Sequence, residues 1–165
     1  MTIETGSLDK ATCSRVAQAL ALRAERLSNP NPRVGCVITS RSGEVLGQGH
    51  TQQVGGPHAE VMALRDAQAH SASLKGATVF VTLEPCSHHG RTPPCCDALI
   101  AAGIAKIVVA TLDPNPKVGG RGLQLLRAGG IEVELLPPDS EPALASRELN
   151  IGFFSRMIRA RPGCG

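Results

Sequence analysis

The sequence predicts an α/β protein, a three-layer α/β/α sandwich in which helices cover both faces of a mixed sheet of about five strands. Residues 77–83 and 104–110 form nearly continuous apolar runs, which indicate strands buried on both faces. Residues 58–70 and 95–102, which precede these runs, have apolar side chains at helical spacing. A hairpin comes earlier in the chain. Strands that alternate with helices in this way are typical of α/β folds.

Five helices are expected from apolar residues that recur every three or four positions and from the residues that end each segment. The first helix ends at residues 28–32, Ser-Asn-Pro-Asn-Pro, because each proline disfavours helical backbone at the residue before it. Gly103 suits the position just after the third helix. The expected helices cover residues 9–27, 58–70, 95–102, 122–128 and 143–159.

Five strands are expected between and beside these helices. The first two form a hairpin around a turn at Ser42 and Gly43, and the last alternates apolar and acidic residues. The glycines of residues 119–122 do not have dinucleotide-binding spacing and follow a loop, so we expect no nucleotide cofactor there. The expected strands cover residues 34–38, 44–49, 77–83, 104–110 and 131–136.

Length and composition favour one globular domain, residues 1–165, and disfavour several classes of partner. The chain has 165 residues, of which 42% are hydrophobic and 19% charged. A net charge of +3, the lack of a Lys/Arg-rich block and only 2% aromatic residues argue against a nucleic-acid partner. No apolar run reaches the roughly 18 residues that span a bilayer, and the N-terminus does not resemble a signal peptide. We therefore expect a cytoplasmic protein without a membrane partner.

Two of the six cysteines stand out. In a reducing compartment most cysteines are small buried residues or free thiols, and this suits Cys13, Cys36 and Cys164. Cys86 and Cys95 instead bracket a polar, proline-bounded loop, residues 85–95, which reads Pro-Cys-Ser-His-His-Gly-Arg-Thr-Pro-Pro-Cys. The loop follows the strongest predicted strand, and Cys95 begins a predicted helix.

His58 and Glu60, at the start of another predicted helix, can join these cysteines. Taken singly, a histidine at a helix start is usually a surface or capping residue. Together, His58, Cys86 and Cys95 would leave the fourth position of a tetrahedral Zn²⁺ open, which is the pattern of a catalytic site. The residues match the H-x-E and P-C signature of zinc deaminases, except that eight residues rather than two separate the cysteines.

Within the long insert, Arg91 is the natural phosphate contact, because a guanidinium pairs with phosphate oxygens through two hydrogen bonds. Four segments of the chain closely resemble the deaminase domain of the bacterial bifunctional riboflavin-biosynthesis deaminase/reductase family. The resemblance runs from about residue 12 to 160. The segments are residues 29–38, 58–60, 82–95 and 113–116.

This resemblance implies a cytidine-deaminase-like fold and a zinc-dependent hydrolase that acts on a cyclic amidine C–N bond. The substrate would be 2,5-diamino-6-ribosylamino-4(3H)-pyrimidinone 5′-phosphate, and the products 5-amino-6-ribosylaminouracil 5′-phosphate and ammonia. By motif position, His58, Cys86 and Cys95 would hold Zn²⁺ and Glu60 would be the catalytic proton shuttle. The residues at substrate-binding positions are Asn31, His88, Arg91, Asp113 and Asn115.

The resemblance also bears on partners. The family's reductase domain has no counterpart in these residues, so any reductase would be a separate protein, or this sequence is a shortened form or a paralogue. We expect a homo-oligomer. Two alternatives stay open. Because His50, Thr51 and Gly56 depart from the family pattern beside the substrate, the enzyme could deaminate another pyrimidine or a nucleoside. A non-catalytic zinc-binding interaction domain is the third hypothesis, and Glu60 argues against it, since a purely structural site needs no such acid.

Overall fold

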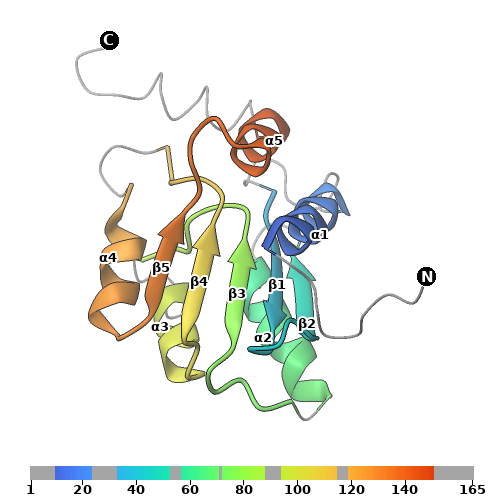
Figure 1. Ribbon diagram of the computed structural model, residues 1–165, viewed down its shortest axis with the longest axis vertical. Helices are drawn as coiled ribbons and strands as arrows, with labels where there is room; N and C mark the ends of the chain where they lie inside the picture. Colours follow the sequence, from blue (N-terminus) through green and yellow to red (C-terminus); the bar gives the residue numbers. More distant parts are fainter. Residues whose placement is uncertain are drawn as a thin grey trace.

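Helices and strands alternate along the chain as the sequence predicts (Figure 1). The computed structural model describes residues 10–23, 33–52, 57–70, 72–87, 94–114 and 119–150. The helices are α1 (Lys10–Arg23), α2 (Ala59–Ala69), α3 (Cys95–Ala101), α4 (Arg121–Ala128) and α5 (Glu141–Leu149). The strands are β1 (Gly35–Thr39), β2 (Val45–His50), β3 (Thr78–Val81), β4 (Lys106–Val109) and β5 (Glu132–Leu135).

The strands form one mixed sheet in the order β2-β1-β3-β4-β5, which confirms the predicted sheet. β1 is antiparallel to both of its neighbours, whereas β3, β4 and β5 are parallel. The start of β1 therefore lies beside the carboxyl end of β3, where Cys36 pairs with Val81. The central strands β1, β3 and β4 are almost wholly buried, and the edge strands β2 and β5 are partly exposed. This burial explains why the central strands read as continuous apolar runs.

Helices cover both faces of the sheet and complete the three predicted layers (Figure 1). α1 and α5 lie on one face, where the α1 side chains Cys13, Ala17 and Leu20 pack against Val37 and Phe80. α2, α3 and α4 lie on the other face, over a larger core cluster from the same strands. Along each strand the two clusters take alternate residues, because successive side chains point to opposite faces.

Two helices approach the sheet closely because glycines lie opposite alanines. A Cβ atom on Gly35 of β1 would lie 1.8 Å from the Ala17 carbonyl oxygen of α1. On the opposite face, a Cβ on Gly47 of β2 would lie 2.4 Å from the Ala63 carbonyl oxygen of α2. Real Cβ atoms do not come so close to other atoms, so only glycine allows this separation between helix and strand.

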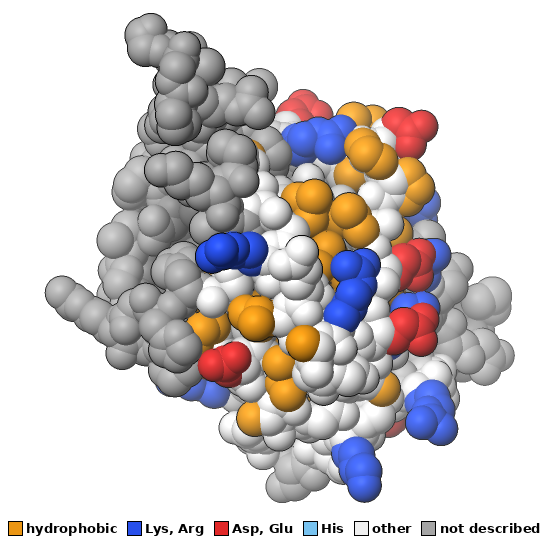
Figure 2. Space-filling view, turned by 90° about the vertical axis from the view of Figure 1, so that its left-hand side faces the viewer, with side chains coloured by type: hydrophobic (Ala, Val, Ile, Leu, Met, Phe, Trp, Pro, Cys, Tyr) orange, Lys and Arg blue, Asp and Glu red, His pale blue; other side chains and the backbone are white. Residues whose placement is uncertain are grey.

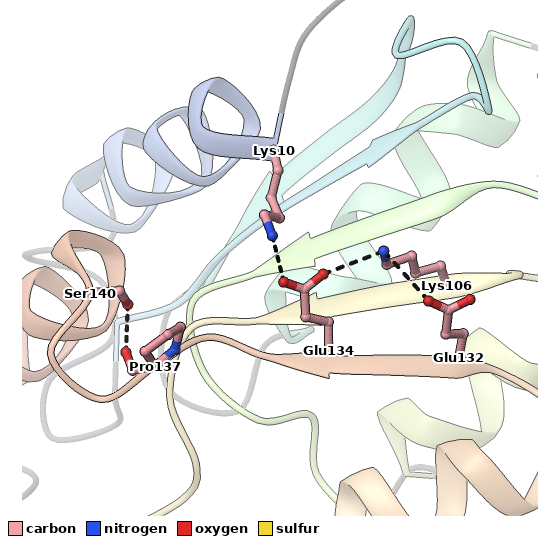
Figure 3. A network of polar contacts seen from close by, with 6 residues as sticks. All are labelled: Lys10, Lys106, Glu132, Glu134, Pro137 and Ser140. Carbon is pink, nitrogen blue, oxygen red and sulfur yellow. Dashed lines mark hydrogen bonds and ion pairs between the residues drawn. The ribbon is translucent and has the colours of Figure 1, made fainter.

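An ionic network joins α1 to the sheet on the α1 face (Figure 3). Lys10 Nζ lies 2.5 Å from Glu134, and Lys106 Nζ lies 3.3 Å from Glu134 and 3.6 Å from Glu132. The hydrogen bond from Lys10 is the largest cause that lowers the pKa of Glu134. Because all four side chains are partly exposed, water screens the charges, and each pair contributes at most about 1 kcal/mol.

The open edge at β5 and α4 carries exposed hydrophobic side chains. Figure 2 shows hydrophobic side chains there, interspersed with charged ones. Leu125 and Leu135 are 40% and 38% exposed. Single exposed leucines of this kind are ordinary on a protein surface.

The ends of most described elements differ from the predicted ones by one or two residues, and the differences at β3, β4 and α5 reach two residues. β3 ends at Val81 rather than Leu83. The Thr82 N–H still bonds to the Gly35 carbonyl of β1, but the Gly35 N–H bonds to the Thr82 hydroxyl, and the Thr82 carbonyl accepts the Ser146 hydroxyl of α5. α5 begins at Glu141, two residues earlier than predicted, with Pro142 in its first turn, where the missing N–H is not needed. The hydroxyl of Ser140 bonds to the Pro137 carbonyl rather than to the helix (Figure 3).

The predicted ends of the first and last helices, residues 24–32 and 151–159, lie outside the described residues. Within the described part of the chain, every helix is too short or too polar to cross a lipid bilayer.

We expect Gly35→Ala to lower the free energy of unfolding by about 1–3 kcal/mol or more, since the new methyl group would overlap backbone atoms of α1. Urea denaturation measures this change. Gly129→Ala is the matched control: the three atoms nearest to its Cβ would be side-chain atoms of Ile100 rather than backbone atoms, and the backbone angle at Gly129 (φ −83°) suits alanine. An equal loss for the two variants would contradict the close-packing argument.

Candidate metal centre and active site

The candidate site lies at the carboxyl end of β3, where several chain segments meet. Cys86 follows β3 by five residues, and the N-termini of α2 and α3 bring His58 and Cys95 to the same place. Parallel strands expose their carboxyl ends at one edge of a sheet, and α/β proteins place ligand sites there. The sequence prediction that two adjacent helix starts bring these three side chains together is therefore met by the structure.

The three predicted metal ligands form one cluster. Their ligand atoms all lie within 4.8 Å of one another. His58 Nδ1 is 3.2 Å from Cys95 Sγ and 3.7 Å from Cys86 Sγ. In a tetrahedral zinc site, Zn–S bonds of about 2.3 Å and Zn–N bonds of about 2.0 Å put the ligand atoms about 3.5–3.8 Å apart. The donor types and their separations thus fit Zn²⁺ with one position left for another ligand.

Local structure fixes each ligand. His58 is the N-cap residue of α2, with an extended backbone. Cys95 is the first residue of α3 and donates its N–H to Cys86 Sγ over 3.2 Å. The next N–H, of Cys96, bonds to the Cys86 carbonyl over 3.3 Å. Cys86 is thus tied to the start of α3, across the insert that separates the two cysteines in the sequence.

The two thiols do not ionise alike. The hydrogen bond from the Cys95 thiol lowers the pKa of Cys86 to about 4, and the same bond raises the pKa of Cys95. A hydrogen bond to Cys86 also raises the pKa of His58. Two sulfurs that share one proton next to an imidazole are a metal-ligand arrangement, because Zn²⁺ displaces that proton and binds both as thiolates.

Glu60 lies beside the cluster but is not part of it. It is the second residue of α2, and only 4% of its surface is exposed. Burial raises the pKa of Glu60 to about 7, and its carboxyl group also interacts with Cys86, His58 and Cys95. A buried carboxyl whose pKa is near neutrality suits an acid–base role.

Cys96, although next to a ligand position, belongs to the core. Its thiol donates to the carbonyl oxygens of Gly122 at 3.4 Å and Pro85 at 3.7 Å. Burial raises the pKa of Cys96 to about 12. Cys96 therefore has its own partners in the core and is not among the clustered ligand atoms.

One of the five predicted substrate-binding residues can be placed. Asp113 lies in the loop after β4, at the same end of the sheet as Cys86, and is half-buried. Asn31, His88, Arg91 and Asn115 lie outside the described residues.

Two of the three residues that depart from the family pattern, His50 and Thr51, lie in the described part of the chain. The third, Gly56, lies outside it. Thr51 is buried, and its hydroxyl accepts the Val34 N–H over 2.9 Å. Its side chain therefore serves the sheet rather than a ligand. His50, at the end of β2, is half-buried, and its Nδ1 lies 3.1 Å from the Thr51 carbonyl.

Glu84, two residues before Cys86, is a buried acid that the sequence analysis did not single out. Its carboxylate accepts backbone N–H groups from the loop that follows β4 and from the start of α4. Two sequence features could have pointed to Glu84. An acidic residue stands between a predicted strand and Pro85-Cys86, and the glycines of residues 119–122 have no role in the sequence prediction.

Comparison with known proteins agrees with this geometry. Residues 9–111 match the family model described as the cytidine and deoxycytidylate deaminase zinc-binding region. The chain is 54% identical over 148 residues to the riboflavin biosynthesis protein RibD of Escherichia coli K12, with 88% of this chain and 38% of that protein covered. It therefore spans well under half the length of that relative.

A shorter relative is covered almost whole. The chain is 43% identical over 143 residues to the diaminohydroxyphosphoribosylamino-pyrimidine deaminase of Buchnera aphidicola subsp. Schizaphis graminum, with 87% of this chain and 92% of that protein covered. Among solved structures, a diaminohydroxyphosphoribosylaminopyrimidine deaminase/5-amino-6-(5-phosphoribosylamino)uracil reductase of Thermotoga maritima superposes with a TM-score of 0.82 at 40% identity. That match covers 92% of this chain and 42% of the other.

We expect the purified protein to contain about one equivalent of Zn²⁺ per chain, measured by elemental analysis. Cys95→Ser should lose the metal, since a ligand thiolate is removed. Cys96→Ser is the matched control and should keep it, because that thiol bonds to carbonyl groups outside the cluster. Zinc loss from the Cys96 variant alone would show that the ligand set is wrong.

Proposed function

The chain belongs to the zinc-binding cytidine and deoxycytidylate deaminase family, and from this premise we propose that it is a diaminohydroxyphosphoribosylaminopyrimidine deaminase. The reaction is the hydrolytic deamination of 2,5-diamino-6-ribosylamino-4(3H)-pyrimidinone 5′-phosphate. The products are 5-amino-6-ribosylaminouracil 5′-phosphate and ammonia. The observation that carries this proposal is the clustering of His58, Cys86 and Cys95 beside the buried Glu60. The near-complete overlap with the Buchnera deaminase supports the choice of substrate.

The metal site has a defined part in this proposal. His58 Nδ1 and the sulfurs of Cys86 and Cys95 would hold the ion, and these three protein ligands would leave a fourth position for water or substrate. When bound, Zn²⁺ supplies a Lewis acid that makes water a better nucleophile at neutral pH. A purely structural zinc site would use four protein ligands.

Glu60 would carry the proton transfers. Its carboxylate accepts a proton from the attacking water, which forms a bond to the amidine carbon of the ring. Glu60 passes this proton to the ring nitrogen, then takes the second proton from the hydroxyl group now on the amidine carbon and delivers it to the departing amino group, and the C–N bond breaks to release ammonia. The burial of Glu60 favours this role, because it keeps bulk water away and holds the pKa near neutrality.

We propose that five residues bind the substrate, with Arg91 on the 5′-phosphate. Asp113 is half-buried at the edge of the sheet that carries Cys86. The other members of the set are Asn31, His88 and Asn115. We further propose that residues 1–165 form one deaminase domain, and that the reductase activity named for the Thermotoga maritima protein belongs to other residues than these.

Deamination of another pyrimidine is the second candidate, favoured by His50, which departs from the family pattern near the site. The test is to incubate the zinc-loaded protein with the diaminopyrimidine phosphate, with cytidine and with dCMP, and to measure ammonia. Release from the diaminopyrimidine phosphate alone supports the proposal. Faster release from cytidine or dCMP would contradict it.

Glu60→Gln should keep the fold and the zinc but lower turnover by about 10²–10⁴-fold or more, because an amide preserves the shape and cannot carry a proton. Steady-state ammonia release and zinc content are the measurements. Glu132→Gln, the same change on an exposed side chain of β5, should leave turnover unaltered. Residual activity within tenfold of the wild type would remove Glu60 from the mechanism.

Arg91→Ala should lower kcat/KM for the phosphorylated substrate by about 10- to 150-fold, since a charge-assisted hydrogen bond is lost. Activity on the dephosphorylated substrate should change much less. Arg41→Ala, in the exposed β1–β2 turn, is the control and should affect neither substrate. Equal losses on both substrates in the Arg91 variant would show that this side chain does not bind phosphate.

A further inference from the structure

Glu84 forms a second polar centre next to the metal cluster. Its Oε1 accepts the N–H of Asp113 at 3.0 Å and of Gly120 at 2.9 Å. Its Oε2 accepts the N–H of Gly122 at 2.8 Å and of Leu123 at 3.4 Å. The residue is only 7% exposed. One buried carboxylate therefore holds four backbone groups from two segments distant from it in the sequence.

The charge of Glu84 is compensated by backbone groups. Among the described residues, no lysine, arginine or histidine forms an ion pair with it. Instead its oxygens face the N-terminus of α4, whose first N–H groups have no partner within the helix. The positive end of the helix dipole and hydrogen bonds to a charged acceptor stabilise a carboxylate in this position.

The glycines of residues 119–122 serve this arrangement. Gly120, the N-cap residue of α4, has a φ of 89°, which favours glycine. A Cβ on Gly122 would lie 2.4 Å from the Pro85 carbonyl oxygen and 3.0 Å from Glu84 Oε2. The start of α4 can therefore rest directly on Glu84 and Pro85, one residue before Cys86.

Glu84 thus links two parts of the site. On one side it is two residues from the metal ligand Cys86. On the other it holds the backbone of Asp113, and its own N–H bonds to the Thr111 carbonyl over 2.9 Å. We propose that Glu84 is a positioning residue, whose carboxylate fixes the Asp113 loop relative to the metal ligands so that the loop can bind substrate. The inference rests on the proposed function, because it assigns a substrate contact to Asp113.

Glutamine cannot replace Glu84 without loss. Each carboxylate oxygen accepts two N–H groups, and an amide has only one oxygen. The amide NH₂ of Glu84→Gln would face two other donors, whichever way it turned. The variant has nearly the same volume and removes only hydrogen-bond acceptance and charge.

The kinetic test compares Glu84→Gln with Glu132→Gln, which removes one charge from an exposed side chain. We expect the Glu84 variant to bind one Zn²⁺ and to raise KM about tenfold or more, with a smaller change in kcat, because the loop and not the proton shuttle is displaced. Unchanged kinetics in the folded variant would overturn the proposal. Zinc loss would also overturn it, since Glu84 would then act through the metal.

A double-mutant cycle with Asp113→Ala separates positioning from general stability. If Glu84 acts through the Asp113 loop, the double variant should lose less kcat/KM than the product of the single losses, by a factor of about 3 or more. Independent, multiplicative losses would contradict the proposal. Thermal unfolding of each variant reports any loss of stability separately from these kinetic effects.

Hydrogen exchange tests the contact without any turnover and on the wild-type protein. The amides of Asp113 and Gly120 lie in a loop, yet they should exchange slowly because they bond to a buried carboxylate. In Glu84→Gln the same amides should exchange at least tenfold faster, while amides of β4 stay slow. Fast exchange in the wild type would overturn the proposal even if the variant fails to fold. A wild-type protein without deaminase activity would contradict the proposed function, whereas exchange would still decide whether Glu84 holds the loop.

Discussion

The polar groups of residues 82–85 are buried where the chain leaves β3, and each must find a partner inside the protein. The hydroxyl of Thr82 accepts the Gly35 N–H from β1, and its carbonyl accepts the Ser146 hydroxyl from α5. Glu84 bonds to the loop after β4 and to α4. These bonds draw four elements to the end of β3. Cys86 follows Pro85 directly. The candidate metal ligands therefore meet where this buried, hydrogen-bonded segment ends.

Two buried carboxylates near the cluster have different surroundings and so suit different tasks. Glu84 has both oxygens occupied by backbone N–H groups, which suits a structural role. Burial raises the pKa of Glu60 to about 7, which leaves this carboxyl able to gain and lose a proton near neutrality. Environment, not residue type, separates the positioning acid from the proposed catalytic acid.

The clustered ligand atoms and Asp113, the proposed substrate contact that the structure describes, come from different segments at the same end of the sheet. His58 and Cys95 begin helices packed on the sheet, and Cys86 is tied to one of them. Asp113 belongs to a loop, which Glu84 holds in place. A rigid reactive centre with separate loops around it keeps the chemistry constant while the loops determine what binds.

The sequence by itself determined the class of fold, the position of every described helix and strand to within a few residues, and the residues of the metal cluster. It could do so because burial periodicity and chain-breaking residues are local, and because His58, Glu60, Cys86 and Cys95 form a recognisable set. The tertiary structure alone decided the strand order, the antiparallel placement of β1 and the roles of Glu84 and Thr51. The hydrogen-bond partners of Glu84 lie 29 to 39 residues away. No local pattern specifies such pairings, because they arise only when the folded chain brings buried donors and acceptors together.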